Sequence, residues 1–120
     1  MGEGSGMATH DLTSAALAER WLASWNSNDL VAVMKCYAEE ATVIGPGLTR
    51  HSKTEVTAFF RDHFPWDAGF QLAEASFIAS GDKVAVQYLG PVSKLPHVSV
   101  LTVRDGLIVK QDIYSKGRPK

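Results

Sequence analysis

The sequence of 120 residues has a single cysteine, Cys36, and almost no net charge. One thiol excludes an internal disulfide and a zinc site built from cysteines, and the spacing of the four histidines suggests no metal site. No apolar run approaches the roughly 18 residues that a membrane span needs. Twelve basic and thirteen acidic residues give a formal charge of −1, so we expect neither nucleic acid nor a membrane as a partner.

The amino-terminal residues also lack a basic segment followed by an apolar one, so the sequence predicts no export signal and a cytoplasmic location. Met1 to Gly6 are rich in glycine and precede a second methionine, Met7. We interpret residues 1–10 as a flexible segment outside the fold, whether it is native or left by an expression vector. The remaining length and a hydrophobic share of 45% suit one globular domain over residues 11–120.

Helical spacing dominates the first part of the chain. Leu17, Trp21 and Trp25 recur every fourth residue and predict an amphipathic helix, which either Asp11 or Thr13 can cap. The helix should end at residues 26–28, because the side chains of Asn-Ser-Asn compete for backbone hydrogen bonds.

Further elements follow from caps and breakers. Asp29 is a capping residue for a short second helix that carries residues 30–37. Residues 41–44 predict a short strand, which the Gly-Pro-Gly sequence at 45–47 ends. Ser52 to Glu55 have the pattern of a capping box for a third helix, with His63 on its apolar face.

After Trp66 the apolar residues alternate with polar ones, as in strands. Turn residues separate the alternating segments, which predict strands at 70–80, 83–89, 97–103 and 107–114. Helices followed by consecutive strands predict an α+β domain, with helices packed on one face of an antiparallel sheet.

Two stretches resemble the nuclear-transport-factor-2-like superfamily. One comprises residues 22–30 (LASWNSNDL) and 34–43 (MKCYAEEATV), and the other is the closing hairpin at 103–114 (VRDGLIVKQDIY). With the order of elements, the resemblance covers about residues 12–116. It implies a cone-shaped curved antiparallel sheet wrapped around three N-terminal helices (a cystatin-like α+β barrel), with an apolar cavity inside. It also implies a homodimer formed through the outer face of the sheet.

The superfamily includes ketosteroid isomerases, SnoaL-like polyketide cyclases, limonene epoxide hydrolases and non-catalytic binding modules. The general base, the tyrosine and the second acid of a ketosteroid isomerase fall on Gly45, Trp21 and Ser99, so steroid isomerisation is disfavoured. The Arg-x-Asp pair of an epoxide hydrolase is missing around Gln87. Asp112 on the last strand matches the inward acid of the hydrolases and cyclases.

The resemblance makes Asp112 a candidate catalytic acid or base, with His97 or His63 assisting. Alternation places Asp112 on the same face as Lys110 and Tyr114. If that face lines the cavity, desolvation suits Asp112 to proton transfer near neutral pH. The alternative is an ion pair with Lys110 on the outer face or at a dimer interface. Each histidine has the alternative of being a hydrogen-bonded core or rim residue.

An apolar cavity of this kind also needs walls, a lid and a few polar contacts. We expect Trp21, Tyr37 and Phe60 to line it, Trp66 to act as a lid, and Gln87 or Tyr88 to supply a polar contact. Three further residues of the predicted sheet complete the candidate binding set: Ser99, Leu101 and Tyr114.

Three functions remain open at this point. The first is an enzyme that performs cofactor-independent acid–base chemistry on a small apolar molecule, by cyclisation, isomerisation, dehydration or epoxide hydrolysis. The second is a non-catalytic binding protein for a small hydrophobic ligand. The third is an interaction module that uses the face of its sheet. None of the three requires a cofactor or a metal, and the direction of Asp112 separates the first from the others.

Overall fold

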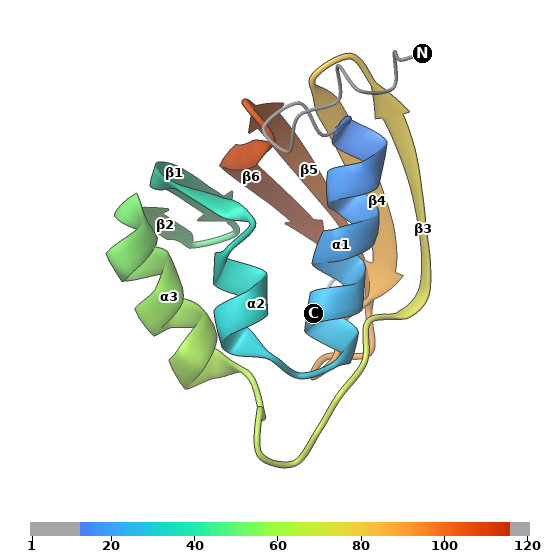
Figure 1. The fold of residues 1–120 in the computed structure, drawn as a ribbon. Coiled ribbons are helices and arrows are strands. Elements are labelled where there is room, and N and C mark those ends of the chain that lie inside the picture. Colours follow the sequence, from blue (N-terminus) through green and yellow to red (C-terminus); the bar gives the residue numbers. More distant parts are fainter. Residues whose placement is uncertain (1–12, 116–120) are drawn as a thin grey trace.

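The computed structural model describes residues 13–115 (Figure 1). The predicted flexible segment, Asp11 and the basic tail of residues 116–120 lie outside the described residues. Helix α1 spans Ser14–Asn26, and its cap is Thr13, whose side chain accepts a hydrogen bond from the Ala16 amide. The predicted apolar stripe is buried along its length: Leu17, Trp21 and Trp25.

Two polar residues fix the turn after α1. Asp29 caps helix α2 (Leu30–Met34) as predicted, because its Oδ1 accepts from the Ala32 amide at 3.0 Å. Asn28 has a positive φ of 56°, and its side chain exchanges hydrogen bonds with the backbone of Phe70. The end of α1 is therefore tied to the segment that leads into the large part of the sheet.

Six strands form one sheet in the order β2-β1-β6-β5-β4-β3. Their bounds are β1 Tyr37–Gly45, β2 Leu48–His51, β3 Ala73–Ser80, β4 Lys83–Leu89, β5 Pro96–Arg104 and β6 Leu107–Ser115. Neighbouring strands are antiparallel except β1 and β6, which run parallel. The sheet curves around the helices without closing, which confirms the predicted α+β class (Figure 1).

Three strands of the sheet differ from the prediction. Strand β1 begins at Tyr37, which we expected on the second helix, because that helix ends at Met34. Strand β2 was not predicted: it is short and largely polar, and only its antiparallel pairing with β1 makes it a strand. Strand β3 starts at Ala73 rather than residue 70, because residue 70 belongs to the segment held by Asn28.

Helix α3 (Ser52–His63) begins with the predicted pair of Ser52 and Glu55. The Glu55 amide donates to Ser52 Oγ at 3.3 Å, but the Glu55 carboxylate accepts from the His51 amide rather than from that of Ser52. The capping box is thus closed one residue earlier than predicted. Val56 and Phe60 form its buried face, whereas His63 is exposed and does not lie on the apolar face as expected.

The helices cover the concave face of the sheet at two places. Helix α1 packs against β3 and β4, and helix α3 packs against β1 and β2. The core lies between these layers, and no helix of residues 13–115 covers the convex face of the sheet (Figure 1). None of the helices in residues 13–115 has the length and apolarity needed to cross a membrane.

Candidate ligand-binding cavity

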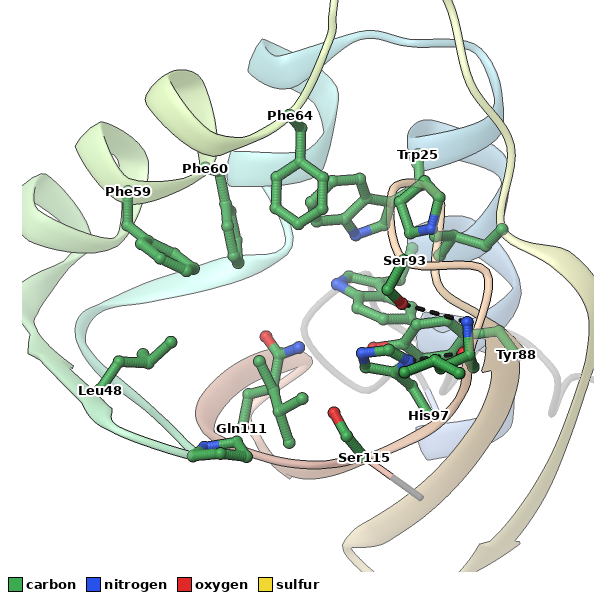
Figure 2. A pocket seen from close by; sticks show the side chains of 16 residues that line it. Trp25, Leu48, Phe59, Phe60, Phe64, Tyr88, Ser93, His97, Gln111 and Ser115 are labelled. Atoms are coloured by element: carbon green, nitrogen blue, oxygen red, sulfur yellow. Dashed lines mark hydrogen bonds between the residues drawn. The ribbon is translucent and has the colours of Figure 1, made fainter. Parts of the chain in front are cut away.

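A cavity of about 350 Å³ lies between the helices and the concave face of the sheet. Figure 2 shows Trp25, Phe59, Phe60 and Phe64 on the helical side and Leu48, Gln111 and Ser115 on the opposite side. The full lining is Trp21, Trp25, Pro46, Leu48, Phe59, Phe60, Phe64, Leu72, Tyr88, Pro91, Ser93, Leu95, His97, Gln111, Ile113 and Ser115. Its walls are therefore mostly aromatic and aliphatic.

The aromatic wall follows from helical spacing. Trp21 and Trp25 lie one turn apart on α1, and Phe60 lies one turn before Phe64 at the end of α3. Trp25 packs edge-on against Phe60 and Phe64, with ring centroids 5.0 and 5.1 Å apart. Such edge-to-face contacts add to the stabilisation that burial of the rings provides. The wall is accordingly held in shape by the core itself.

A chain of hydrogen-bonded side chains runs from helix α1 across to the sheet. Trp21 Nε1 donates to the Tyr37 hydroxyl at 2.9 Å, and this hydroxyl donates to Gln111 Oε1 at 2.5 Å. Gln111 Nε2 donates to Ser99 Oγ at 3.1 Å, and Ser99 Oγ lies 2.8 Å from the Tyr88 hydroxyl. All five residues are buried, so these bonds satisfy groups that water would otherwise have to satisfy. We call these five residues the polar chain.

The two tyrosines of the polar chain stay protonated at neutral pH. Burial raises the pKa of Tyr37 well above its usual value, although the hydrogen bond from Trp21 acts in the opposite direction. Burial likewise raises the pKa of Tyr88, partly offset by its hydrogen bond with Ser99. Both hydroxyls can therefore donate hydrogen bonds throughout the physiological range of pH.

His97 lies at one end of the cavity beside Tyr88, where their rings stack with centroids 5.7 Å apart (Figure 2). Its Nδ1 is 2.8 Å from the Leu95 carbonyl, which also accepts from the Gly90 amide at 2.8 Å. A carbonyl only accepts, so Nδ1 carries the hydrogen and Nε2 of the neutral ring keeps its lone pair. His97 is thus hydrogen-bonded to the loop of residues 90–95, which contributes three lining residues.

Gly90 lets this loop approach His97 closely. A Cβ added at Gly90 would lie 2.6 Å from Ser93 Oγ and 2.8 Å from His97 Cε1, so any larger residue must push the ring or the loop away. The imidazole of His97 is therefore held between the Leu95 carbonyl and the backbone of Gly90.

Asp112 does not border the cavity. Its neighbours Gln111 and Ile113 both line it, and alternation along β6 then directs Asp112 to the convex face. There Asp112 Oδ2 lies 3.8 Å from Lys110 Nζ, and the Asp112 side chain is 23% exposed. This is the alternative of an outer-face ion pair, and the geometry gives Asp112 no contact with a molecule inside the cavity.

The other residues predicted for the site lie at different distances from the cavity. Trp21, Phe60, Tyr88 and His97 border the cavity, and Tyr37 and Ser99 support it through the polar chain. Leu101 is fully buried in the core, and Trp66 stacks on Trp25 outside the lining. Three lie away from the cavity: Gln87 and Tyr114 on the convex face and His63 on the exposed side of α3.

Sequence reasoning missed Gln111, the polar residue at the centre of the cavity floor. A usable signal was present, because Gln111 shares its side of the strand with Ile113, whereas Asp112 shares its side with Lys110. A lysine seldom faces a core, so the side opposite Lys110 is the inner one. Within residues 13–115, no three histidine, cysteine or acidic side chains gather as metal ligands would.

Comparison with known proteins agrees with this architecture. A family model described as "SnoaL-like domain" matches residues 18–111. A SnoaL-like protein of unknown function from Burkholderia thailandensis has 21% sequence identity and a TM-score of 0.76, over 87% of this chain and 95% of that one. No curated protein matches the chain in sequence.

Two further solved structures carry names that suggest a function. A candidate polyketide cyclase from Pseudomonas putida has 18% identity and a TM-score of 0.72, over 86% of this chain and 91% of that one. A candidate ketosteroid isomerase from Kribbella flavida has 19% identity and a TM-score of 0.74, over 89% and 80%. At these identities the likeness concerns the fold alone.

Proposed function

Because this chain belongs to the family of SnoaL-like domains, we propose that it binds a small, largely apolar molecule in the cavity between its helices and its sheet. The observation that carries the proposal is the cavity itself, at about 350 Å³. This volume lies within the range of about 300–1,000 Å³ that is typical of small-molecule sites, and apolar walls with few polar groups are their usual composition.

Charge restricts the class of ligand further. Among the described residues that line the cavity, none is an aspartate, glutamate, lysine or arginine. A charged ligand would lose its hydration without gaining an opposite charge, which is costly in an apolar site. The proposed ligand is therefore neutral.

A matched pair of isoleucine substitutions tests the proposal. Ile113→Phe places a larger ring in the cavity, whereas Ile78→Phe makes the same change on β3, where Ile78 is 78% exposed. The ligand probes are 2-tetralone and tetralin, two neutral bicyclic molecules, followed through tryptophan fluorescence and calorimetry. We expect wild type and Ile78→Phe to bind at least one probe and Ile113→Phe to bind neither.

Two results would contradict this proposal. One is that neither probe binds wild type and that no apolar molecule can be extracted from the purified protein. The other is that Ile113→Phe binds the probes as tightly as Ile78→Phe does, which would put the bound molecule outside the cavity.

A second function, proton transfer without a cofactor, is supported by His97. Its Nδ1 contact with the Leu95 carbonyl leaves Nε2 of the neutral imidazole as a base at the end of the cavity. A base in reach of an acidic C–H group is the minimum that isomerisation, cyclisation or dehydration needs. The competing assignment is that Asp112, which the family resemblance suggests, transfers the proton instead of His97.

The exchange of the α-hydrogens of 2-tetralone in deuterium oxide, followed by NMR, separates the two assignments. Catalysis by His97 predicts that His97→Gln reduces the exchange rate by about 100-fold or more, the usual contribution of a general base. Asp112→Asn should then leave the rate within about twofold. The reverse result would assign the proton transfer to Asp112. If wild type exchanges the hydrogens no faster than buffer alone, the function is binding without catalysis.

We also propose that two copies of the chain pair through the convex face of the sheet. In the part of the chain that the structure describes, no helix covers that face, and apolar side chains are exposed there, with Ile78 at 78% and Tyr114 at 59% exposure. Analytical ultracentrifugation should show a dimer for wild type and a monomer for Ile78→Glu. A monomeric wild type at micromolar concentration would contradict the pairing.

A further inference from the structure

The hydrogen bonds of the polar chain run in one direction, from donor to acceptor, and Trp21 determines that direction. Trp21 Nε1 carries a hydrogen and can only donate, so the Tyr37 oxygen accepts from it. The Tyr37 hydrogen is then free to go to its second partner, Gln111 Oε1. The Gln111 side chain is oriented by this contact, because its oxygen faces Tyr37 and its amide nitrogen therefore faces Ser99.

The direction continues through Ser99 to Tyr88. Ser99 is fully buried, and its Oγ already accepts from Gln111 Nε2. Among the described residues, the Tyr88 hydroxyl is the one partner that can accept the Ser99 hydrogen. If Tyr88 donated instead, the Ser99 hydrogen would have no acceptor in a place that water does not reach, which folded proteins avoid. Ser99 is therefore the donor and Tyr88 the acceptor.

This direction leaves hydrogens unused beside the cavity. The Tyr88 hydroxyl accepts from Ser99 and keeps its own hydrogen for another partner. Gln111 has a second amide hydrogen, because only one is bound to Ser99. Both groups line the cavity and are neighbours, since they bind the same oxygen at 2.8 and 3.1 Å. Figure 2 shows the Gln111 amide extending from the floor toward the aromatic wall.

A second observation points the same way. Within residues 13–115, Trp25 Nε1 is the one buried side-chain nitrogen or oxygen without a hydrogen-bond partner. It is also a donor, and Trp25 lines the same cavity. Trp25 Nε1, the Tyr88 hydrogen and the second Gln111 amide hydrogen are thus three donors without a partner in or beside the cavity.

We propose that the Tyr88 hydroxyl, with the Gln111 amide beside it, donates hydrogen bonds to a carbonyl-type oxygen of the ligand. The inference rests on the proposed binding function and narrows its ligand to a neutral, mostly apolar molecule that carries such an oxygen. A hydrocarbon leaves these donors unpaired, and an ammonium compound, which only donates, cannot accept from them and meets no counter-charge among the described lining side chains.

Three probes with one bicyclic frame test this recognition: 2-tetralone, tetralin and the ammonium form of 2-aminotetralin. The measured quantity is the ratio of the tetralin to the 2-tetralone dissociation constant, compared between variants so that the hydrophobicity of each probe cancels. We expect Tyr88→Phe to lower this ratio about tenfold, the contribution of one well-made hydrogen bond. The ammonium probe should not bind at concentrations of 2-tetralone that saturate the protein.

Tyr114→Phe is the matched control, because Tyr114 is 59% exposed on the convex face and lies outside the cavity lining. The ratio of the tetralin to the 2-tetralone dissociation constant should be the same in Tyr114→Phe as in wild type. If Tyr88→Phe does not fold, Ser99→Ala supplies the test, because the variant removes the hydroxyl that holds the Tyr88 hydroxyl and the Gln111 amide side by side. We expect Ser99→Ala to lower the ratio about threefold, a part of the full effect of Tyr88.

The outcomes separate this inference from the proposed function. Absence of binding by all three probes would overturn both. Binding with the same ratio in wild type, Tyr88→Phe and Ser99→Ala would overturn the hydrogen bond while leaving the cavity as a binding site. Binding of the ammonium probe as tightly as 2-tetralone would also overturn the inference, because a group that only donates would then bind without accepting from Tyr88 or Gln111.

Discussion

Removal of a single oxygen atom, by Tyr37→Phe, should destabilise the fold far more than its size suggests. The Tyr37 side chain is 1% exposed, and its hydroxyl is bound at both ends, by Trp21 Nε1 and by Gln111 Oε1. The substitution leaves one buried donor and one buried acceptor without partners. Each such group costs about 1–3 kcal/mol. Trp21 and Gln111 both border the cavity, where water can replace part of the loss, so we expect about 2–4 kcal/mol in total.

Urea unfolding followed by circular dichroism measures this free energy of unfolding, with an unchanged dependence on urea as the sign that both proteins unfold in the same way. Tyr114→Phe removes the same atom from a side chain that is 59% exposed, and should change stability by at most about 0.5 kcal/mol. A Tyr37→Phe protein as stable as Tyr114→Phe would contradict the expected loss of stability. It would mean that the polar chain is either not formed in solution or fully replaced by water.

Further predictions follow from three other features. Because burial raises the pKa of Tyr37, the folded protein keeps a proton that the unfolded chain releases above pH about 10. Stability should therefore fall as pH rises beyond that value, by about 1.4 kcal/mol per pH unit for this group, and urea unfolding should show a shallower fall for Tyr37→Phe. Burial also raises the pKa of the Cys36 thiol, against the opposite effect of Arg20. Its reaction with a disulfide reagent, followed by absorbance, should be at least about 100-fold slower in the native protein than in urea, and equal rates would contradict the buried position. Asn28→Ala removes the hydrogen bonds to Phe70 and should cost about 1–3 kcal/mol, seen by calorimetry as a lower Tm, whereas an unchanged Tm would show that this link is not formed.

The parts of the fold that the sequence predicted are those with local signals. Thr13 and Asp29 are capping residues whose partners lie three residues away, so each helix start is encoded within one turn. Strand β4 was predicted with its observed bounds, because Gly81 and Asp82 mark the preceding turn and its residues alternate strictly between buried and exposed. Strand β2 has no such pattern, and it exists through its pairing with β1.

The site was less predictable because its contacts join distant residues. Alternation divides the residues of β6 into two sets but does not say which set faces inward. The family resemblance favoured the set with Asp112, and the structure brings Gln111 inward instead. Tyr37 and Gln111 are 74 residues apart, so their hydrogen bond depends on the completed sheet and on no local motif.

Strand β6, the last described strand along the chain, lies inside the sheet between β1 and β5. This position determines how the two parts of the sheet are joined. Strand β6 pairs with β1 on one side and with β5 on the other, so that Asp112 lies opposite both Ile44 and Val100. Strands β3 to β5 form from neighbouring segments, but they join the β1–β2 hairpin only when β6 docks between them. Such distant pairings form late, because closing a long loop is entropically costly. Tyr88 and Gln111 lie on β4 and β6, whereas Phe59 and Phe60 lie on α3, which packs against β1 and β2, so these polar groups and these phenylalanines of the cavity come from opposite sides of this junction. The cavity is therefore complete only when β1 has paired with β6, and ligand binding depends on that parallel pairing.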